Sequence, residues 1–222
     1  MKVIVTCGPS YEPIDDVRRL TNFSTGELGV LLSNELLRAG GEVFCLKGAA
    51  ATYPGAIERG QFLTFTTNDS LADLLREFSG TQEIAAVFHS AALCDYKVKT
   101  VADAQGQAVR STKISSRAGS LTLHLEPATK IISDLRTLFP HSLLVGWKYE
   151  LAGTRDQALD QAWRQIDENR TDACVVNGAA YGSGFAFCTD TARRSIIECH
   201  DKESLVRFLR TWLEQRVAKR PG

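Results

Sequence analysis

The first loop of the chain carries side chains that could bind an anion. A β-branched run, Val3-Ile4-Val5, predicts a first strand, and an amphipathic stretch from Thr25 predicts a first helix. The polar segment that joins them is roughly three times longer than the about two to six residues of an ordinary strand-to-helix loop. In open α/β sheets, ligands bind beyond the carboxyl ends of the strands. We therefore expect residues 6–29 to form part of a binding site.

The chemistry expected of this loop is phosphate binding at a helix N-terminus. Gly8 ends the first strand in a turn, and residues 24–27 form a capping-box pattern with Ser24 as the N-cap. Free N–H groups of the first turn and the hydroxyls of Ser24 and Thr25 would donate to a phosphate, and Gly26 would let it approach the backbone closely. The alternative is an ordinary capped helix in which Gly26 has no ligand to bind.

Two common nucleotide motifs are absent from this loop. No Gly-Lys-Ser/Thr follows the first strand, so the loop is not a P-loop. It also lacks the tight G-x-G-x-x-G of dinucleotide enzymes, which counts against a simple NAD-dependent reductase.

The elements that must position this loop alternate between strand and helix. The candidate strands are the short apolar runs Lys2–Thr6, Glu42–Lys47, Gln61–Thr66, Ile84–His89, Leu143–Trp147 and Ala173–Asn177. The candidate helices lie near Thr25–Ala39, Ser70–Ser79, Lys130–Leu138 and Arg155–Asn169, with a last helix after Asp201. Such alternation predicts an α/β fold of the Rossmann-like, doubly wound kind, with a mainly parallel sheet and helices on both faces.

Two segments interrupt the alternation. Residues 97–126 have no helical period, and Leu121–Leu125 alternates apolar and polar side chains, so we expect a protruding hairpin or flap. Residues 178–189 are glycine-rich and are expected to be irregular, followed by a strand over Arg193–His200. We find no internal repeat or linker, so the 222 residues are expected to form a single domain.

Composition excludes several classes of protein. The 26 Lys and Arg residues balance the 26 Asp and Glu residues, which argues against a nucleic-acid binder that relies on a general basic field. The six cysteines show no C-x-x-C spacing, so we expect no zinc site and a reduced, cytoplasmic protein. No apolar run approaches the roughly 18 residues of a membrane span, and the first strand begins too early to leave room for a signal peptide.

The loop motifs resemble a known enzyme family, the phosphopantothenate–cysteine ligases (phosphopantothenoylcysteine synthetases). The first match is Gly8-Pro9-Ser10-Tyr11-Glu12-Pro13-Ile14-Asp15 with Val17-Arg18, then Asn22-Phe23-Ser24-Thr25-Gly26 and Gly29. Later matches, in family order, are Ala91-Ala92-Leu93-Cys94-Asp95-Tyr96, Lys113-Ile114, Pro127 to Ile132, Val145-Gly146 and Asp172 to Asn177. The resemblance covers nearly the whole chain and is most specific in the first motif.

This resemblance implies an amide-forming ligase of coenzyme A synthesis. Members activate the carboxylate of phosphopantothenate with CTP or ATP, release pyrophosphate and form an acyl-nucleotidyl anhydride, which the amine of cysteine then attacks. Mg²⁺ would bridge the phosphates. The family is dimeric, which implies a homodimer to which the flap over residues 97–126 contributes. Many relatives are fused to a flavin-dependent decarboxylase, for which this chain has no residues left over, so no flavin is expected.

The resemblance also assigns roles to individual residues. Asn22 matches the asparagine of the second half-reaction, whose amide would hold the acyl oxygen, and Lys113 matches the first lysine of a Lys-x-Lys-Lys loop that closes over the intermediate. Ala91 and Ala92 would bring backbone close to the base, and Asp95 would serve the nucleotide or its metal. The remaining assignments are nucleotide contacts by Gly8, Ser24, Thr25, Gly26 and Lys130, and substrate contacts by Arg18 and Asn177.

Departures from the family pattern keep other functions open. Lys113 is followed by Ile114-Ser115-Ser116, so the second and third lysines are missing, with Arg117 one residue further on. Glu27 stands where many members carry a basic residue. These changes leave two alternatives, a non-catalytic nucleotide-binding relative and an NAD(P)-dependent oxidoreductase. His89 and Cys94 are interpreted as core residues, a hydrogen-bonded imidazole and an inert thiol.

Overall fold

A central eight-stranded sheet organises the chain in a computed structural model, which describes residues 1–81 and 83–219. The sheet contains β1 (Lys2–Cys7), β4 (Glu42–Gly48), β5 (Gln61–Phe65), β6 (Ala86–His89), β9 (Leu143–Tyr149), β10 (Ala173–Gly178), β11 (Gly182–Thr189) and β12 (Ser195–Cys199). The helices are α1 (Glu27–Arg38), α2 (Asn68–Thr81), α3 (Ile131–Leu138), α4 (Arg155–Asn169) and α5 (Lys202–Ala218). Two ribbons stand apart, β2 (Tyr11–Pro13) with β3 (Arg19–Thr21), and β7 (Tyr96–Ala102) with β8 (Thr122–Pro127).

The strand order of the sheet is β12-β11-β10-β9-β6-β1-β4-β5. β1 pairs in parallel with β4 on one side and with β6 on the other. After β5, which pairs with β4, the chain therefore crosses back to the other side of β1 to form β6. β9 and β10 continue the parallel part, while β11 and β12 add an antiparallel edge. The doubly wound, mainly parallel sheet expected from the sequence is confirmed. Its ligand-binding crevice lies at the carboxyl ends of β1 and β6.

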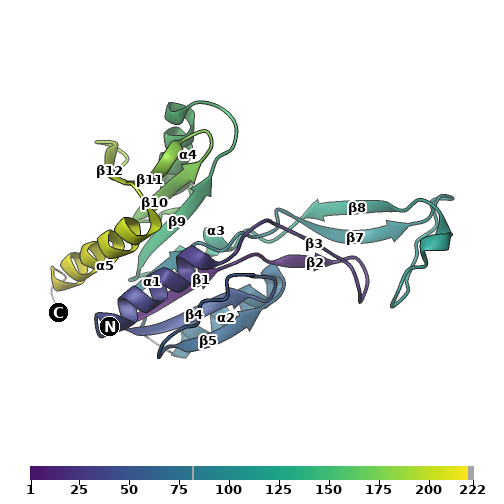
Figure 1. Ribbon diagram of the computed structural model, residues 1–222, viewed down its shortest axis with the longest axis horizontal. Coiled ribbons are helices and arrows are strands. Elements are labelled where there is room, and N and C mark those ends of the chain that lie inside the picture. Colours follow the sequence, from purple (N-terminus) through teal and green to yellow (C-terminus); the bar gives the residue numbers. More distant parts are fainter. Residues whose placement is uncertain (82, 220–222) are drawn as a thin grey trace.

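Helices cover both faces of the sheet (Figure 1). Because successive side chains of a strand point to opposite faces, Val3 and Val5 of β1 pack with α1 and α5, whereas Ile4 packs with α2 and α3. α4 packs on the β10–β11 end through Ala162, which contacts a cluster that includes Cys174. The core is therefore divided between the two faces, and the polar strand ends are left to form the site.

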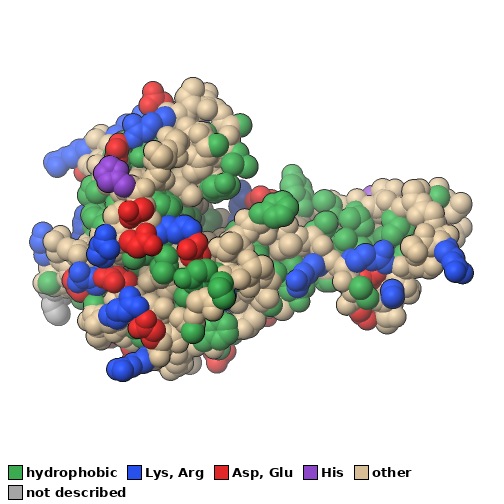
Figure 2. All heavy atoms as spheres, in the orientation of Figure 1, with side chains coloured by type: hydrophobic (Ala, Val, Ile, Leu, Met, Phe, Trp, Pro, Cys, Tyr) green, Lys and Arg blue, Asp and Glu red, His purple; other side chains and the backbone are tan. Residues whose placement is uncertain are grey.

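A long arm projects from the sheet beyond these strand ends (Figure 1). In it β7 and β8 run antiparallel, with Tyr96 opposite Pro127 and Ala102 opposite Thr122, and the β2–β3 ribbon lies beside the base of β7. The hairpin expected over residues 97–126 is confirmed. Figure 2 shows hydrophobic side chains along this arm, and the surface is hollowed between the arm and the part that carries α4.

The start of α1 corrects the expected capping box. Gly26 is the N-cap, with a left-handed φ of 78°, and the helix begins at Glu27 without a side-chain cap. Thr25 Oγ1 accepts a hydrogen bond from the backbone N–H of Glu27, and Ser24 does not cap the helix. A left-handed N-cap carries the preceding residues away from the helix end, so a side chain two residues earlier does not cap it.

The glycine-rich segment over residues 178–189 is also more regular than expected. Its second part, β11, pairs antiparallel with β10 and places Phe187 opposite Val175 and Cys188 opposite Cys174. Phe185 to Cys188 are all buried, so the run has no polar alternation from which a strand could be predicted. The expectation of an irregular segment was wrong because α4 and α5 cover both faces of this strand.

Two features of the described residues bear on the composition. All six cysteines are free and buried, in keeping with thiols that pack as small hydrophobes. No helix in residues 1–81 and 83–219 has the length and apolar character to cross a membrane.

The contact of α1 with β1 supports a prediction about two glycines. A Cβ on Gly29 would lie 2.2 Å from the Cβ of Cys7, whereas a Cβ on Gly80 in α2 would meet nothing within 4 Å. Gly29→Ala is expected to lower the free energy of unfolding by about 1–3 kcal/mol through overpacking. Gly80→Ala, the matched control, is expected to raise it by up to about 1 kcal/mol through helix propensity. Urea denaturation measures both, and equal effects would contradict the close packing of α1 on β1.

Candidate functional site

Two glycines lie against each other where β1 ends and α1 begins, and neither lines the two cavities described below. Gly8 and Gly26 both have a left-handed φ, 74° and 78°, and a Cβ on Gly26 would lie 3.3 Å from the Cα of Gly8. The backbone N–H of Ala92 donates to Gly8 O at 3.0 Å. The structure therefore brings together three of the predicted nucleotide-binding residues. Thr25 and Ser24 lie on the same loop, the first exposed and the second half-buried.

Asn22 connects the first loop to the loop after β6. Its Nδ2 donates to Leu93 O at 2.8 Å and to Ala92 O at 3.3 Å. Both bonds come from the Nδ2 group, so Oδ1 is left as an acceptor. To donate a hydrogen bond to an acyl oxygen, the Asn22 amide must therefore give up its bond to one of these two carbonyls. Catalytic hydrogen bonds often tighten only when the substrate is bound.

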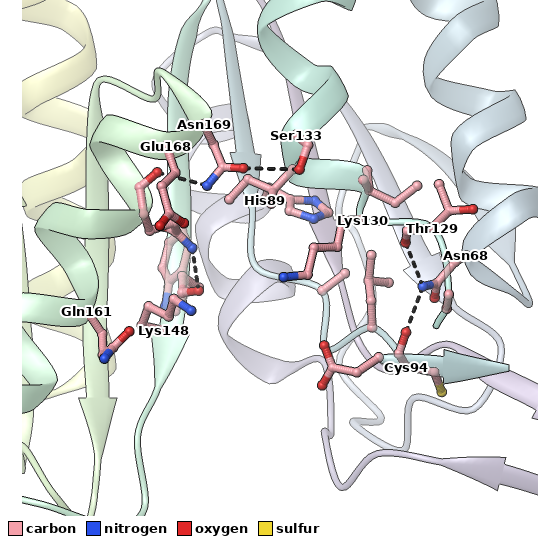
Figure 3. A pocket seen from close by; sticks show the side chains of 18 of the residues that line it. Asn68, His89, Cys94, Thr129, Lys130, Ser133, Lys148, Gln161, Glu168 and Asn169 are labelled. Carbon is pink, nitrogen blue, oxygen red and sulfur yellow. Dashed lines mark hydrogen bonds between the residues drawn. The ribbon is translucent and has the colours of Figure 1, made fainter. Parts of the chain in front are cut away.

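A cavity of about 370 Å³ opens at this strand edge, between α3 and α4 (Figure 3). Ala91, Asp95 and Lys130, all predicted nucleotide-binding residues, line it. In Figure 3 the Lys130 side chain points from one wall into the cavity, toward the wall that carries Lys148 and Gln161. The cavity thus has a cation and a carboxylate on one side and a polar helix on the other.

The α4 wall contains residues that the sequence analysis did not identify. Gln161, Arg164, Gln165 and Glu168 line the cavity together with Trp147 and Lys148 of β9. The four α4 residues follow i, i+3, i+4, i+7 spacing, which places them on one face of a helix. That polar stripe, on a helix whose other face is apolar, was a signal available in the sequence.

A buried hydrogen-bond network holds the other wall in place. Asn68, at the start of α2, donates from Nδ2 to Cys94 O at 2.8 Å and to Thr129 O at 3.1 Å. Its Oδ1 accepts from the Ser10 hydroxyl at 2.7 Å, and Ser10 Oγ accepts from the backbone N–H of Cys94 at 2.8 Å. One side chain therefore links the loops that follow β1, β6 and β8. No sequence motif identifies Asn68, because its partners are far apart in the chain.

Cys94 and His89 behave as core residues. The Cys94 thiol is buried, and its burial raises its pKa, so the reactive thiolate is disfavoured. His89 is buried, its Nδ1 lies 2.8 Å from Thr6 Oγ1, and burial lowers its pKa to about 4. Both residues are therefore buried and hydrogen-bonded as expected, and both also line the cavity of about 370 Å³.

His89 leads to a pH-dependent prediction. Its folded-state pKa of about 4 lies below the ordinary value of 6.5 because burial penalises the imidazolium. The unfolded chain therefore binds the proton more tightly, and the stabilising contribution is present above about pH 6.5 and lost as pH falls toward 4. We expect a loss on the order of 3 kcal/mol between these limits. Urea denaturation should show a weaker pH dependence in His89→Gln, and an unchanged one in His124→Gln, whose side chain is exposed on the arm. Equal pH profiles for wild type and His89→Gln would contradict this assignment.

Asn177 lies in a second cleft, of about 590 Å³, on the other side of the end of β9. Glu27 at the start of α1 and Lys202 at the start of α5 line the same cleft and form an ion pair across it. Asn177 is thus separated by β9 from Asp95 and Lys130, which lie in the first cavity.

Arg18 and the backbone next to Lys113 meet toward the outer end of the arm, where the turn between β2 and β3 lies against the loop between β7 and β8. Arg18 pairs with Asp15 at 2.5 Å and also donates to Ile114 O, next to Lys113. Asp15 accepts from the backbone N–H of Ile114 at 3.1 Å, and these donors hold the pKa of the Asp15 carboxyl well below its usual range. Within the part of the chain that the structure describes, neither Lys113 nor Arg18 lines the two cavities. The contacts of Arg18 in this structure are therefore those of a salt bridge with Asp15 and a hydrogen bond to Ile114 O.

Two carboxylates line the first cavity, Asp95 after β6 and Glu168 on the facing wall of α4, and Asp95 is the one that the sequence predicts as a metal ligand. Outside Gln82 and the last three residues, no group of three or more His, Cys, Asp or Glu side chains is arranged to hold a metal ion. Mg²⁺ in nucleotide sites needs only one or two carboxylates, with phosphate oxygens and waters completing its shell. The residues therefore fit a magnesium ion that arrives on a nucleotide, with Asp95 as its protein ligand.

Comparisons with known proteins agree with this geometry. The family model described as DNA/pantothenate metabolism flavoprotein C-terminal domain matches residues 1–220. The coenzyme A biosynthesis bifunctional protein CoaBC of Thermococcus kodakarensis is 33% identical over 183 residues, 82% of this chain and 42% of that protein. CoaBC of Bacillus subtilis is 28% identical over 184 residues, again 82% of this chain and 42% of that protein.

A solved structure shows the same fold. The DNA/pantothenate metabolism flavoprotein from Streptococcus pneumoniae superposes with a TM-score of 0.83 at 26% identity, covering 99% of this chain and 100% of that one. The chain spans about 42% of the length of the two CoaBC relatives, so it corresponds to one part of them. Its sequence motifs, its crevice and the family model over residues 1–220 together show that the chain belongs to the phosphopantothenoylcysteine synthetase family, the C-terminal domain family of the DNA/pantothenate metabolism flavoproteins.

Proposed function

We propose that this protein joins cysteine to phosphopantothenate in coenzyme A biosynthesis, using a nucleoside triphosphate. The carboxylate oxygen of phosphopantothenate attacks the α-phosphorus, and pyrophosphate leaves. The amine nitrogen of cysteine then attacks the acyl carbon and loses a proton, and the nucleoside monophosphate leaves. The observation that carries the proposal is the contact of Asn22 with Ala92 O and Leu93 O, beside the cavity of Ala91, Asp95 and Lys130.

The charges of the site suit the first step. A carboxylate and a triphosphate repel each other, so their reaction needs cations and N–H donors nearby. Lys130 extends into the cavity, and the left-handed backbone at Gly8 and Gly26 lets an anion approach the start of α1. A magnesium ion on the nucleotide, held by Asp95, supplies further charge neutralisation when bound. Lys113 reaches the intermediate if the loop over residues 103–121 moves from its place beside Asp15.

The base of the nucleotide fits the cavity between α3 and α4. Ala91 lines this cavity and is small enough for backbone to approach a base. Both CTP and ATP fit this description, and a competition assay with the two nucleotides decides between them. No flavin is part of the proposal.

The arm supports the proposal of a homodimer. It exposes large apolar side chains at Val17, Phe23, Tyr96 and Leu125. A second copy of the chain that packs on this arm would bury these apolar side chains. Light scattering on the purified protein tests this state.

One assay separates the proposed ligase from its alternatives. The protein is mixed with phosphopantothenate, Mg²⁺ and CTP or ATP, with and without cysteine, and pyrophosphate is followed. Release that requires phosphopantothenate supports the ligase, whereas nucleotide binding without release supports a non-catalytic relative. Quenching of Trp147 fluorescence by NADPH, with no response to CTP, supports an oxidoreductase.

A further inference from the structure

The two cavities lie on opposite sides of the end of β9. Trp147 and Lys148 line the cavity beside α3 and α4, while the next residue, Tyr149, lines the cleft beside α1 and α5. α1 starts at this cleft with Glu27, one residue after Gly26 of the crevice. A ligand in the second cleft therefore approaches the crevice from the side opposite to a nucleotide in the first cavity.

The second cleft is lined by one lysine, Lys202, and by three carboxylates, Glu27, Asp201 and Glu203. An ion pair joins the start of α1 to the start of α5 across it. Lys202 Nζ pairs with Glu27 Oε2, and the two side chains remain 42% and 32% exposed. Ion pairs with this much exposure add little to stability, so a ligand can separate them at low cost. Asp201 also lines the cleft, but its carboxylate caps α5 by accepting from the Ser204 N–H at 2.7 Å.

A third polar group faces the same cleft. The Asn177 side chain is half-buried at the end of β10 and has no hydrogen-bond partner among the described residues. Its amide can donate and accept. Glycines of the β10–β11 turn, Gly178, Gly182 and Gly184, line the cleft as well and leave its rim free of side chains. Glu203 and His200 complete its charged and titratable lining.

We propose that this cleft, between the starts of α1 and α5, binds the amino-acid substrate as a zwitterion. Lys202 pairs with the α-carboxylate and Glu27 with the α-ammonium, so the ligand replaces one ion pair by two. Asn177 supplies a further hydrogen bond to the carboxylate. The inference rests on the proposed ligase function. It places the amine of cysteine on one side of the end of β9 and the nucleotide on the other side.

Ligand binding tests the charge assignment without any turnover. L-cysteine, cysteamine (which lacks the carboxylate) and 3-mercaptopropionate (which lacks the amine) are titrated into ¹⁵N-labelled protein, and the amide shifts of Gly182 and Gly184 are followed. L-cysteine is expected to bind at least tenfold more tightly than either fragment, because only it engages both charges. Equal binding of all three, or shifts confined to other parts of the chain, overturns the proposal.

Two variants assign the partners. Lys202→Met is expected to weaken the binding of L-cysteine about tenfold while leaving the binding of cysteamine unchanged. Glu27→Gln is expected to weaken the binding of both ligands. The matched controls are Arg38→Met and Glu58→Gln, which remove an exposed ion pair at the other end of α1. These controls should leave all three titrations unchanged. If Lys202→Met weakens cysteamine as much as L-cysteine, the assignment of Lys202 to the carboxylate is wrong.

Kinetics separates this inference from the proposed function. In the complete assay, both variants should raise the KM for cysteine about tenfold, with a smaller change in kcat. A wild-type protein that never releases pyrophosphate in response to phosphopantothenate refutes the ligase function, whatever the titrations show. A wild-type protein that is active, with variants of unchanged cysteine KM, refutes the amino-acid cleft alone.

Discussion

Replacing Asn22 by aspartate is expected to stop amide formation while the acyl-nucleotide accumulates. Aspartate has the shape of asparagine but no amide hydrogens, so it loses the bonds to Ala92 O and Leu93 O and meets them as an acceptor. It also cannot donate to the acyl oxygen as charge develops there. Loss of one such donor typically lowers the rate by about 10²–10³-fold. Quenched reactions analysed by mass spectrometry measure the intermediate and the amide product separately.

The control for this experiment removes a different hydrogen bond from the same loop. Thr21 Oγ1 donates to Ser10 O at 2.7 Å, and Thr21→Val deletes that bond without changing the groups that face Leu93. We expect Thr21→Val to affect both half-reactions alike. Normal amide formation by Asn22→Asp, or selective accumulation of intermediate in Thr21→Val, would contradict the role given to Asn22.

Truncating Asn68 to alanine is expected to produce the largest loss of stability among the polar residues of the site. The change leaves the Ser10 hydroxyl, Cys94 O and Thr129 O without their partner in a buried environment. Each buried polar group left unpaired costs about 1–3 kcal/mol, so the total is about 3 kcal/mol or more. For a chain of this length that corresponds to a fall in Tm of about 6 °C or more. Calorimetry and urea denaturation measure both quantities.

Asn169 offers a matched comparison for Asn68. It lines the same cavity, donates from Nδ2 to Gln165 O and accepts from the Ser133 hydroxyl, but the second bond is solvent-exposed. Asn169→Ala is therefore expected to cost less than about 1 kcal/mol, because water replaces the lost partner. Similar costs for the two variants would show that the Asn68 network does not hold the cavity wall.

Much of the fold was predictable because hydrophobic periodicity reports burial directly. The apolar runs that became β1, β4 and β9 are short, and each lies mostly in the core. β11 escaped prediction because both of its faces are covered, so its alternation vanished. The expected Ser24 cap failed because Gly26 is itself the N-cap in a left-handed conformation, at a place where a Cβ would lie 3.1 Å from the Cβ of Ala51, far along the chain.

The candidate site was predictable only where its residues lie in one contiguous motif. Gly8, Asn22 and Gly26 belong to the first loop, and the structure places all three at the crevice. Lys113 and Arg18 came from the same resemblance, yet they contact the arm and Asp15 and do not line the two cavities that the structure describes. For these two residues to reach the site, either the arm must move or a second copy of the chain must supply them.

By itself, the sequence determined the doubly wound sheet, the long first loop and the family, since local patterning and a contiguous motif specify them. Only the tertiary structure decided which distant residues share a cavity. Asn68 beneath Cys94, the polar face of α4 opposite Lys130, and Glu27 beside Lys202 are neighbours only after the chain has folded. The physical reason is that parallel strands bring their carboxyl ends to one edge of the sheet, whatever the separation of those ends along the chain.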